Sequence, residues 1–261
     1  MKRAIFQDVA SAAKGAASTI AAEARAAIAA RGRFTLAVSG GHTPWLMLRE
    51  LANKDVPWAG VHIFQVDERV APEGHPDRNL ALLRESLLQR VPLPAGHVHA
   101  MPVESADLEA AAAAYSLELR KTAGSPAVLD LVHLGLGPDG HTASLTPGDP
   151  VLQVTNTDVA PTEEYQGRRR MTLTYPALDR ARQVLWVVTG VAKVEMLRRL
   201  YNGDRSIPAG CIRQDNALLI ADRAAVGHRS AEQHTGACDA RRHCDGPRRV
   251  RPERNSVPSC P

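Results

Sequence analysis

A glycine-rich segment in the middle of the sequence carries the two side chains best suited to acid–base chemistry. It follows an apolar run at residues 128–134 and reads Gly135-Leu136-Gly137-Pro138-Asp139-Gly140-His141. Imidazole titrates near neutral pH, so His141 can take a proton from water and later return it. The nearby carboxylate of Asp139 can hold the imidazole tautomer and stabilise the imidazolium. The alternative is a structural turn with a capping histidine.

A second segment is suited to binding an anion. Ser39-Gly40-Gly41-His42-Thr43-Pro44 lies between an apolar run at residues 34–38 and a predicted helix at residues 44–53. Backbone N–H groups at such a helix start can converge on an anion, and the hydroxyls of Ser39 and Thr43 add donors. We expect Thr43 to be the N-cap and Pro44 the first helical residue. A tight turn without a ligand is the alternative.

Further charged side chains follow other predicted strands. Asp67, Glu68 and Arg69 come directly after an apolar run at residues 61–66, where they suit acid–base work and phosphate binding or form a surface ion-pair cluster. Arg170 opens another predicted strand. Lys193 lies in the first turn of a predicted helix, where the helix dipole disfavours a cation unless an anion is near. A solvated lysine without a ligand is the alternative.

The elements that must position these residues alternate between apolar strands and helices. This alternation predicts an α/β fold with a mostly parallel sheet flanked by helices, whose ligands gather beyond the carboxyl ends of the strands. We predict helices at residues 8–30, 44–53, 79–90, 107–121 and 191–201. We predict strands at residues 34–38, 61–66, 128–134, 152–159, 170–175, 183–189 and 217–221.

Composition divides the 261 residues into two parts. Residues 228–261 contain seven arginines, four acids and no Leu, Ile, Met or aromatic residue, so we predict a disordered basic tail. This tail holds +3 of the net charge of +4, and residues 1–227, predicted as one domain, carry only about +1. A nearly neutral domain predicts no nucleic-acid partner. No apolar stretch suits a membrane span or a signal peptide, so we expect no membrane partner and a cytoplasmic location.

Taken in order, these motifs resemble the glucosamine-6-phosphate isomerase/6-phosphogluconolactonase family, with the NagB/RpiA/CoA-transferase-like fold. The resemblance covers roughly residues 5–226 and is closest to the lactonase members, because the 135–144 loop continues as Thr142-Ala143-Ser144-Leu145. The other motifs that carry it are Ser39-Gly40-Gly41 with Thr43-Pro44, Asp67-Glu68-Arg69, Asn79, Arg170-Met171-Thr172-Leu173-Thr174, and Gly190 with Lys193.

The resemblance implies hydrolysis of 6-phospho-D-glucono-1,5-lactone to 6-phospho-D-gluconate, in the oxidative branch of the pentose phosphate pathway. We predict His141 as the base, with Asp139 and Asp67 as further catalytic residues. The residues predicted to bind the phosphosugar are Ser39, Gly40, Gly41, Thr43, Arg69, Gly137, Arg170 and Lys193. We expect no metal, no cofactor and either a monomer or a homodimer.

Two other functions fit parts of the pattern. A glucosamine-6-phosphate isomerase/deaminase would use Asp67 to move a proton between two sugar carbons. A non-enzymatic sugar-phosphate sensor would need a DNA-binding module, which we do not find in the sequence.

Overall fold

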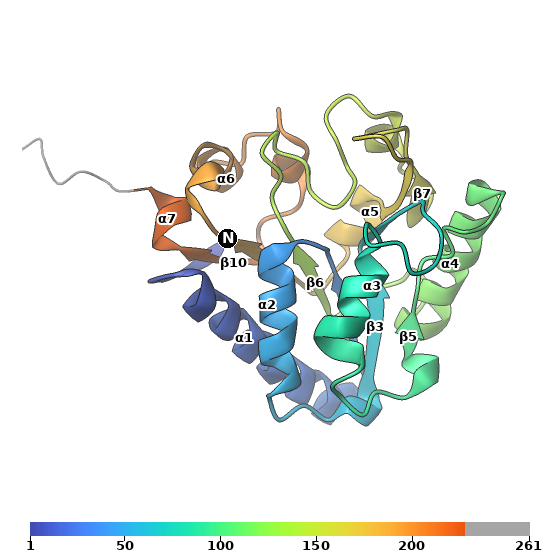
Figure 1. The fold of residues 1–261 in the computed structure, drawn as a ribbon, viewed down its shortest axis with the longest axis horizontal. Helices are drawn as coiled ribbons and strands as arrows, with labels where there is room; N and C mark the ends of the chain where they lie inside the picture. The colour runs from blue at the N-terminus through green and yellow to red at the C-terminus, as the bar shows by residue number, and fades with distance from the viewer. Residues whose placement is uncertain (228–261) are drawn as a thin grey trace, which may run out of the picture. The chain divides into compact units, whose positions relative to one another are not determined.

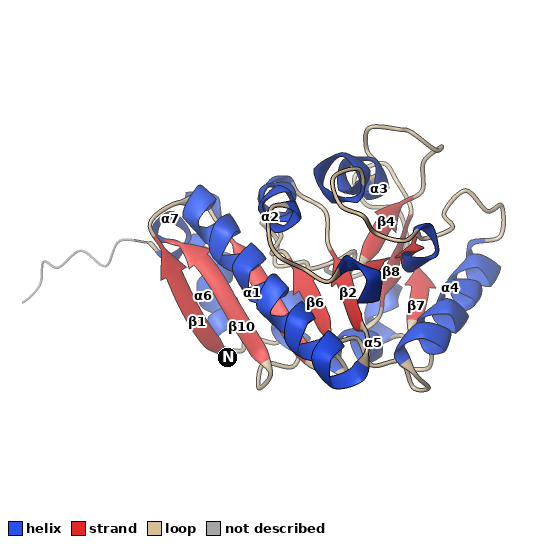
Figure 2. Ribbon diagram, turned by 90° about the horizontal axis from the view of Figure 1, so that it is seen from below, coloured by secondary structure: helices blue, strands red, loops and turns tan. Residues whose placement is uncertain are grey.

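A seven-stranded, fully parallel sheet forms the centre of the fold in the computed structural model, which describes residues 1–227 (Figures 1 and 2). Its strands are β1 (Lys2–Phe6), β2 (Phe34–Val38), β3 (Val61–Gln65), β5 (Val98–His99), β6 (Leu131–Leu134), β9 (Gln183–Val188) and β10 (Ala217–Asp222). They are hydrogen-bonded in the order β1-β10-β9-β6-β2-β3-β5. The predicted α/β class with a mostly parallel sheet is therefore confirmed.

Helices cover both faces of this sheet and produce two apolar cores. One core packs α1 (Val9–Arg31), α2 (His42–Ala52) and α3 (Asn79–Leu83) against one face. The other packs α4 (Leu108–Ala123), α5 (Tyr175–Asp179), α6 (Val194–Tyr201) and α7 (Arg223–Val226) against the opposite face. Burial on both faces explains why the strands read as continuous apolar runs.

Capping residues in the sequence fix both ends of the first helix, α1. Asp8 caps the start of α1 by accepting a hydrogen bond from the Ser11 N–H at 2.8 Å, and the Ser11 hydroxyl oxygen accepts the Asp8 N–H in return. Gly32 ends the helix in the left-handed conformation, at φ 74°. Between these caps a row of alanines is fully buried, so the helix lies close against the strands.

A second, three-stranded antiparallel sheet was not predicted. It consists of β4 (Asp67–Arg69), β8 (Arg170–Leu173) and β7 (Val159–Pro161), in the order β4-β8-β7. Asp67, Glu68 and Arg69 therefore form a strand of their own, which is absent from the predicted strands. Arg69 lies directly opposite Arg170 in the β4–β8 register, so this small sheet brings two of the predicted cations together.

The predicted strand at residues 152–159 was also wrong. Pro150–Gln153 forms a 3-10 turn, because Asp149 caps the N–H of Val151 at 2.8 Å and Pro150 occupies the first helical position. Only Val159 of the predicted range is in a strand. The edge strands β1 and β5 were missed, since β1 carries Lys2 and Arg3 and β5 is only two residues long.

The predicted disordered tail at residues 228–261 lies outside the described residues. Within residues 1–227, no helix is both long and apolar enough to cross a membrane. In the same range no three acidic, histidine or cysteine side chains are grouped so that they could hold a metal ion.

Candidate active site

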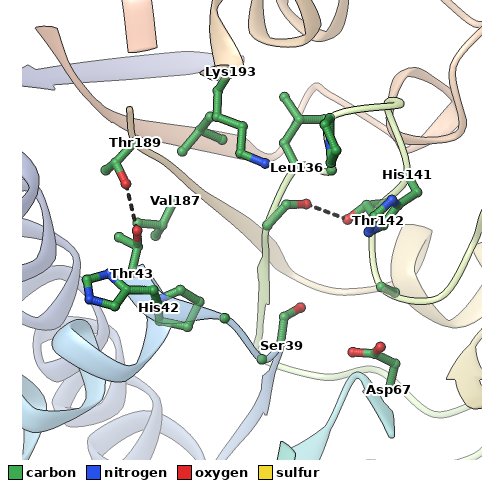
Figure 3. Close-up of a pocket in the computed structure, with 18 of the residues that line it drawn as sticks. Ser39, His42, Thr43, Asp67, Leu136, His141, Thr142, Val187, Thr189 and Lys193 are labelled. Atoms are coloured by element: carbon green, nitrogen blue, oxygen red, sulfur yellow. Dashed lines mark hydrogen bonds between the residues drawn. The ribbon is translucent and has the colours of Figure 1, made fainter. Parts of the chain in front are cut away.

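Most of the predicted site residues meet at one cavity of about 620 Å³. Loops that leave the carboxyl ends of β2, β6 and β9 supply much of its wall, and β4 and β8 close another side. This is the position at which parallel α/β sheets usually bind ligands. Figure 3 shows Lys193 and Asp67 on opposite sides of the cavity, with His141 on a third.

Ten of the predicted residues line this cavity. They are Ser39, Gly40, Gly41, Thr43, Asp67, Arg69, Gly137, His141, Arg170 and Lys193. Asp139 does not line it and lies behind His141 instead. The structure thus brings together residues that are separated by more than 150 positions in the sequence.

The imidazole of His141 is held by Asp139. Its Nδ1 lies 2.5 Å from Oδ1 of Asp139, which also accepts a hydrogen bond from the His141 backbone N–H at 3.1 Å. A carboxylate can only accept, so Nδ1 carries the proton and Nε2 keeps its lone pair. The ring also packs so closely on Gly137 that a Cβ there would lie 2.2 Å from Nδ1. Gly137 is therefore required for this position of the ring.

Asp139 is kept ionised by its hydrogen bonds. Burial alone would raise the pKa of Asp139, but the backbone N–H and ring of His141 and the hydroxyl of Tyr165 outweigh burial and hold that pKa below its ordinary value. The Tyr165 hydroxyl donates to Oδ2 of Asp139 at 3.0 Å. Sequence reasoning missed Tyr165, because it lies in a turn 26 positions from Asp139 and no spacing rule connects the two.

The Ser39–Thr43 segment differs in detail from the prediction. The first helical residue of α2 is His42 and its N-cap is Gly41, so the expectation of Thr43 as N-cap and Pro44 as first helical residue was wrong. Gly41 has φ 123°, a conformation that residues with a side chain rarely adopt, and its carbonyl already accepts the Trp45 N–H at 3.2 Å. The Thr43 hydroxyl instead bonds that of Thr189 at 2.6 Å (Figure 3).

Ser39 is held in place by two hydrogen bonds to the buried His133. Its backbone N–H donates to Nδ1 of His133 at 3.3 Å, and its hydroxyl donates to the His133 carbonyl at 3.0 Å. Burial lowers the pKa of His133 to about 3, so this imidazole is neutral and can accept. Ser39 therefore contributes to the site mainly by fixing the start of the glycine loop.

Asp67 is the buried acid of the cavity wall. Only 5% of its surface is exposed, and its Oδ2 accepts the hydroxyl of Ser144 at 2.6 Å. Burial raises the pKa of Asp67, although Ser144 and the guanidinium of Arg69 oppose that change. The adjacent Glu68 acts on the backbone instead. It is fully buried and caps α3 by accepting the N–H groups of Asn79 and Leu80 at 2.8 and 2.9 Å.

Three cations face the cavity. Arg69 is held by the Asp77 carbonyl at 2.8 Å and by Oδ1 of Asn79 at 3.1 Å. Burial lowers the pKa of Arg170 and of Lys193, and the Nε of Arg170 is buried without a hydrogen-bond partner among the described residues. Desolvated cations with unused donors favour an anionic ligand, because the ligand restores the lost interactions.

The imidazole–carboxylate pair follows a strand of the parallel sheet, whereas Arg69 and Arg170 come from the small antiparallel sheet and Lys193 from the segment after β9. An acid–base pair that shares a cavity with three cations suits an enzyme that acts on a small anionic substrate.

The chain belongs to the family described as glucosamine-6-phosphate isomerases/6-phosphogluconolactonase, whose sequence model matches residues 7–220. It is 40% identical to a 6-phosphogluconolactonase of Synechocystis over 200 residues, which cover 74% of this chain and 83% of that protein. It is 39% identical over 215 residues to a 6-phosphogluconolactonase of Mycobacterium tuberculosis, covering 77% and 87% of the two chains.

Solved structures agree with this assignment. The crystal structure of 6-phosphogluconolactonase from Thermotoga maritima superposes with a TM-score of 0.76 at 26% identity. The superposition covers 85% of this chain and 98% of the other. The resemblance that the motifs indicated is therefore confirmed, over nearly the range of residues expected from the sequence.

Proposed function

We propose that this chain hydrolyses the ester bond of 6-phospho-D-glucono-1,5-lactone, giving 6-phospho-D-gluconate in the pentose phosphate pathway. The names of its relatives support this substrate. The observation that carries the chemistry is the pair formed by His141 and Asp139, at 2.5 Å, at the wall of a cavity that also holds three cations.

In the first step, Nε2 of His141 takes a proton from a water molecule while the water oxygen bonds to the lactone carbonyl carbon. The carbonyl electron pair moves to its oxygen and forms a tetrahedral oxyanion. Asp139 stabilises the imidazolium through Nδ1 and remains ionised. General base assistance of this kind is worth roughly 10²–10⁴ in rate.

In the second step, the oxyanion collapses and the bond between the carbonyl carbon and the ring oxygen breaks. The imidazolium returns its proton to that ring oxygen, which becomes a hydroxyl of the open-chain product. The new carboxylic acid loses its proton to solvent. His141 is then neutral again, so the cycle needs no other proton carrier.

The cavity cations supply capture and orientation. Arg69, Arg170 and Lys193 bind the phosphate and sugar oxygens, and the Ser39–Thr43 segment adds backbone donors at the start of α2. A substrate that lacks the phosphate would leave buried cations unpaired and would be bound much more weakly.

The direct test is a rapid assay on freshly generated lactone, because this ester also hydrolyses spontaneously. The chain is expected to accelerate lactone disappearance and to release no ammonia from glucosamine 6-phosphate. Ammonia release without lactone hydrolysis would instead assign the deaminase activity, in which Asp67 would be the proton carrier. Binding of either sugar phosphate without turnover would favour the sensor.

A further inference from the structure

Two residues of the cavity are connected to each other behind its wall. His141 and Arg170 both line the cavity, whereas Asp139 and Tyr165 do not. Asp139 bonds the His141 ring at 2.5 Å, Tyr165 donates to Asp139 at 3.0 Å, and the guanidinium carbon of Arg170 lies 5.0 Å from the centre of the Tyr165 ring. These three contacts connect the imidazole of His141 to the buried guanidinium of Arg170.

A short turn fixes Tyr165 in this path. The Tyr165 N–H donates to the Arg168 carbonyl at 3.0 Å, and the two residues between them, Gln166 and Gly167, both have positive φ angles of 52° and 76°. This turn connects the segment after β7 to β8, which begins at Arg170. The phenol ring also meets the His141 ring edge to face, with their centres 5.5 Å apart.

Tyr165 completes the hydrogen bonding of the Asp139 carboxylate. Oδ1 accepts both donors of His141, so the orientation of that oxygen does not depend on Tyr165. Oδ2 accepts the Tyr165 hydroxyl, which draws negative charge away from the oxygen that faces the imidazole. Arg170 strengthens this effect, since a cation over a phenol ring makes the hydroxyl a better donor.

We propose that Tyr165 is a positioning residue which, through Asp139, keeps His141 in its free-base form down to lower pH. A weaker charge on Asp139 stabilises the imidazolium less, so water can be activated under more acidic conditions. The charged groups that face this network are Asp139, Arg170 and Lys193, and the last two are cations that act in the same direction. The proposal rests on the function given above.

The test compares Tyr165→Phe with the unaltered chain in pH profiles of kcat/KM and kcat for lactone hydrolysis. Phenylalanine keeps the ring that packs on His141 and Arg170 and removes only the hydroxyl. The acid limb of kcat/KM is expected to move up by roughly half a pH unit. KM at neutral pH should stay within about twofold and kcat on the plateau within about threefold.

Tyr175→Phe is the matched control, because its hydroxyl donates to the Pro208 carbonyl at 3.1 Å and the residue does not line the cavity. It should leave the acid limb in place. In an Asp139→Asn background, Tyr165→Phe should have no further effect on the limb, since the hydroxyl acts through the carboxylate.

An acid limb that stays in place or moves down in Tyr165→Phe contradicts the proposal, as does an equal shift in the Asp139→Asn background. A Tyr165→Phe chain that is unfolded at the assay temperature also contradicts it, because the hydroxyl would then be structural. Failure of the function itself looks different: the unaltered chain would not hydrolyse the lactone at all.

Discussion

At the scale of single residues, the site contains ionisable side chains that are taken out of water. Lys193, Arg170 and Asp67 are all partly or fully buried at one cavity, and burial shifts the pKa of each toward its neutral form. The two cations gain most when an anionic ligand replaces the missing solvent. In the proposed function the cations therefore bind the substrate, whereas His141 carries out the chemical step.

Lys193→Ala tests whether this lysine acts in substrate binding and not in the chemical step. The variant should raise KM by about ten- to a hundredfold with little change in kcat, because a hydrogen bond to a charged group is worth about 1.5–3 kcal/mol. Steady-state kinetics on fresh lactone measure the change. Lys121→Ala is the control, since that side chain is 76% exposed on α4. An unaltered KM in Lys193→Ala would remove the lysine from substrate binding.

Which residues the sequence could predict depended on their spacing. The Asp139–His141 pair is two positions apart in one glycine-rich loop, so it could be recognised directly. Tyr165 and Ser144 reach Asp139 and Asp67 only through the tertiary fold, over 26 and 77 positions. Likewise, no sequence pattern indicates that Ser39 is anchored on His133, which lies in another strand.

At the scale of elements, the β2–α2 segment contacts the start of α3 at one side of the cavity. Glu68 caps α3 and thereby places Asn79, the first residue of that helix, against Gly40. Asn79 in turn donates to the Asp67 carbonyl at 3.0 Å and accepts from Arg69 at 3.1 Å. The strands β2 and β4 are thus coupled to one helix start.

Gly40→Ala should break this contact. A Cβ at this position would lie 2.0 Å from Oδ1 of Asn79, so the amide must move and release Arg69. We expect KM to rise by roughly tenfold and the free energy of unfolding to fall by about 1–3 kcal/mol. Gly96→Ala, where an added Cβ meets nothing within 4 Å, should change neither. Equal kinetics in both variants would show that this contact does not position Arg69.

The elements that the sequence predicted well are those with long apolar runs or clear caps, such as β2, β9 and α1. Those it missed are set by pairing with distant strands. Asp67–Arg69 is polar and only three residues long, and it becomes a strand because β8, about a hundred positions later, is available as its partner. The apolar residues of the 152–159 region misled the prediction, because local caps decide the backbone there.

At the scale of the whole molecule, residues 1–227 enclose two cores on opposite faces of one sheet. Four histidines are built into this sheet and its edge. His62 stacks on His97 with ring centres 3.9 Å apart, and its Nδ1 lies 3.1 Å from Nε2 of His99, while His133 is fully buried. His62 and His133 are neutral in the folded state, since burial lowers the pKa of His62 to about 4 and that of His133 to about 3.

Stability should therefore fall on acidification. The pKa of His62 is about 4 in the folded state and about 6.5 in the unfolded chain. Between these two pH values the unfolded chain therefore binds more protons than the folded chain. The free energy of unfolding should be fully retained above about pH 6.5 and decrease as pH falls toward 4. His62→Gln removes one titrating group. The free energy of unfolding of this variant should therefore change less steeply with pH, by up to about 1.4 kcal/mol per pH unit. Denaturant unfolding at a series of pH values checks this; identical slopes would contradict it.

In the proposed function, His141 activates water at the lactone carbonyl. The most direct measurement is the rate of hydrolysis of fresh lactone by His141→Ala, together with calorimetric binding of 6-phospho-D-gluconate to the same folded variant. We predict a rate lower by about 10²–10⁴ and an affinity for the product within a few-fold of the unaltered chain. An unchanged rate of lactone hydrolysis in this variant would contradict the role of His141 as the base.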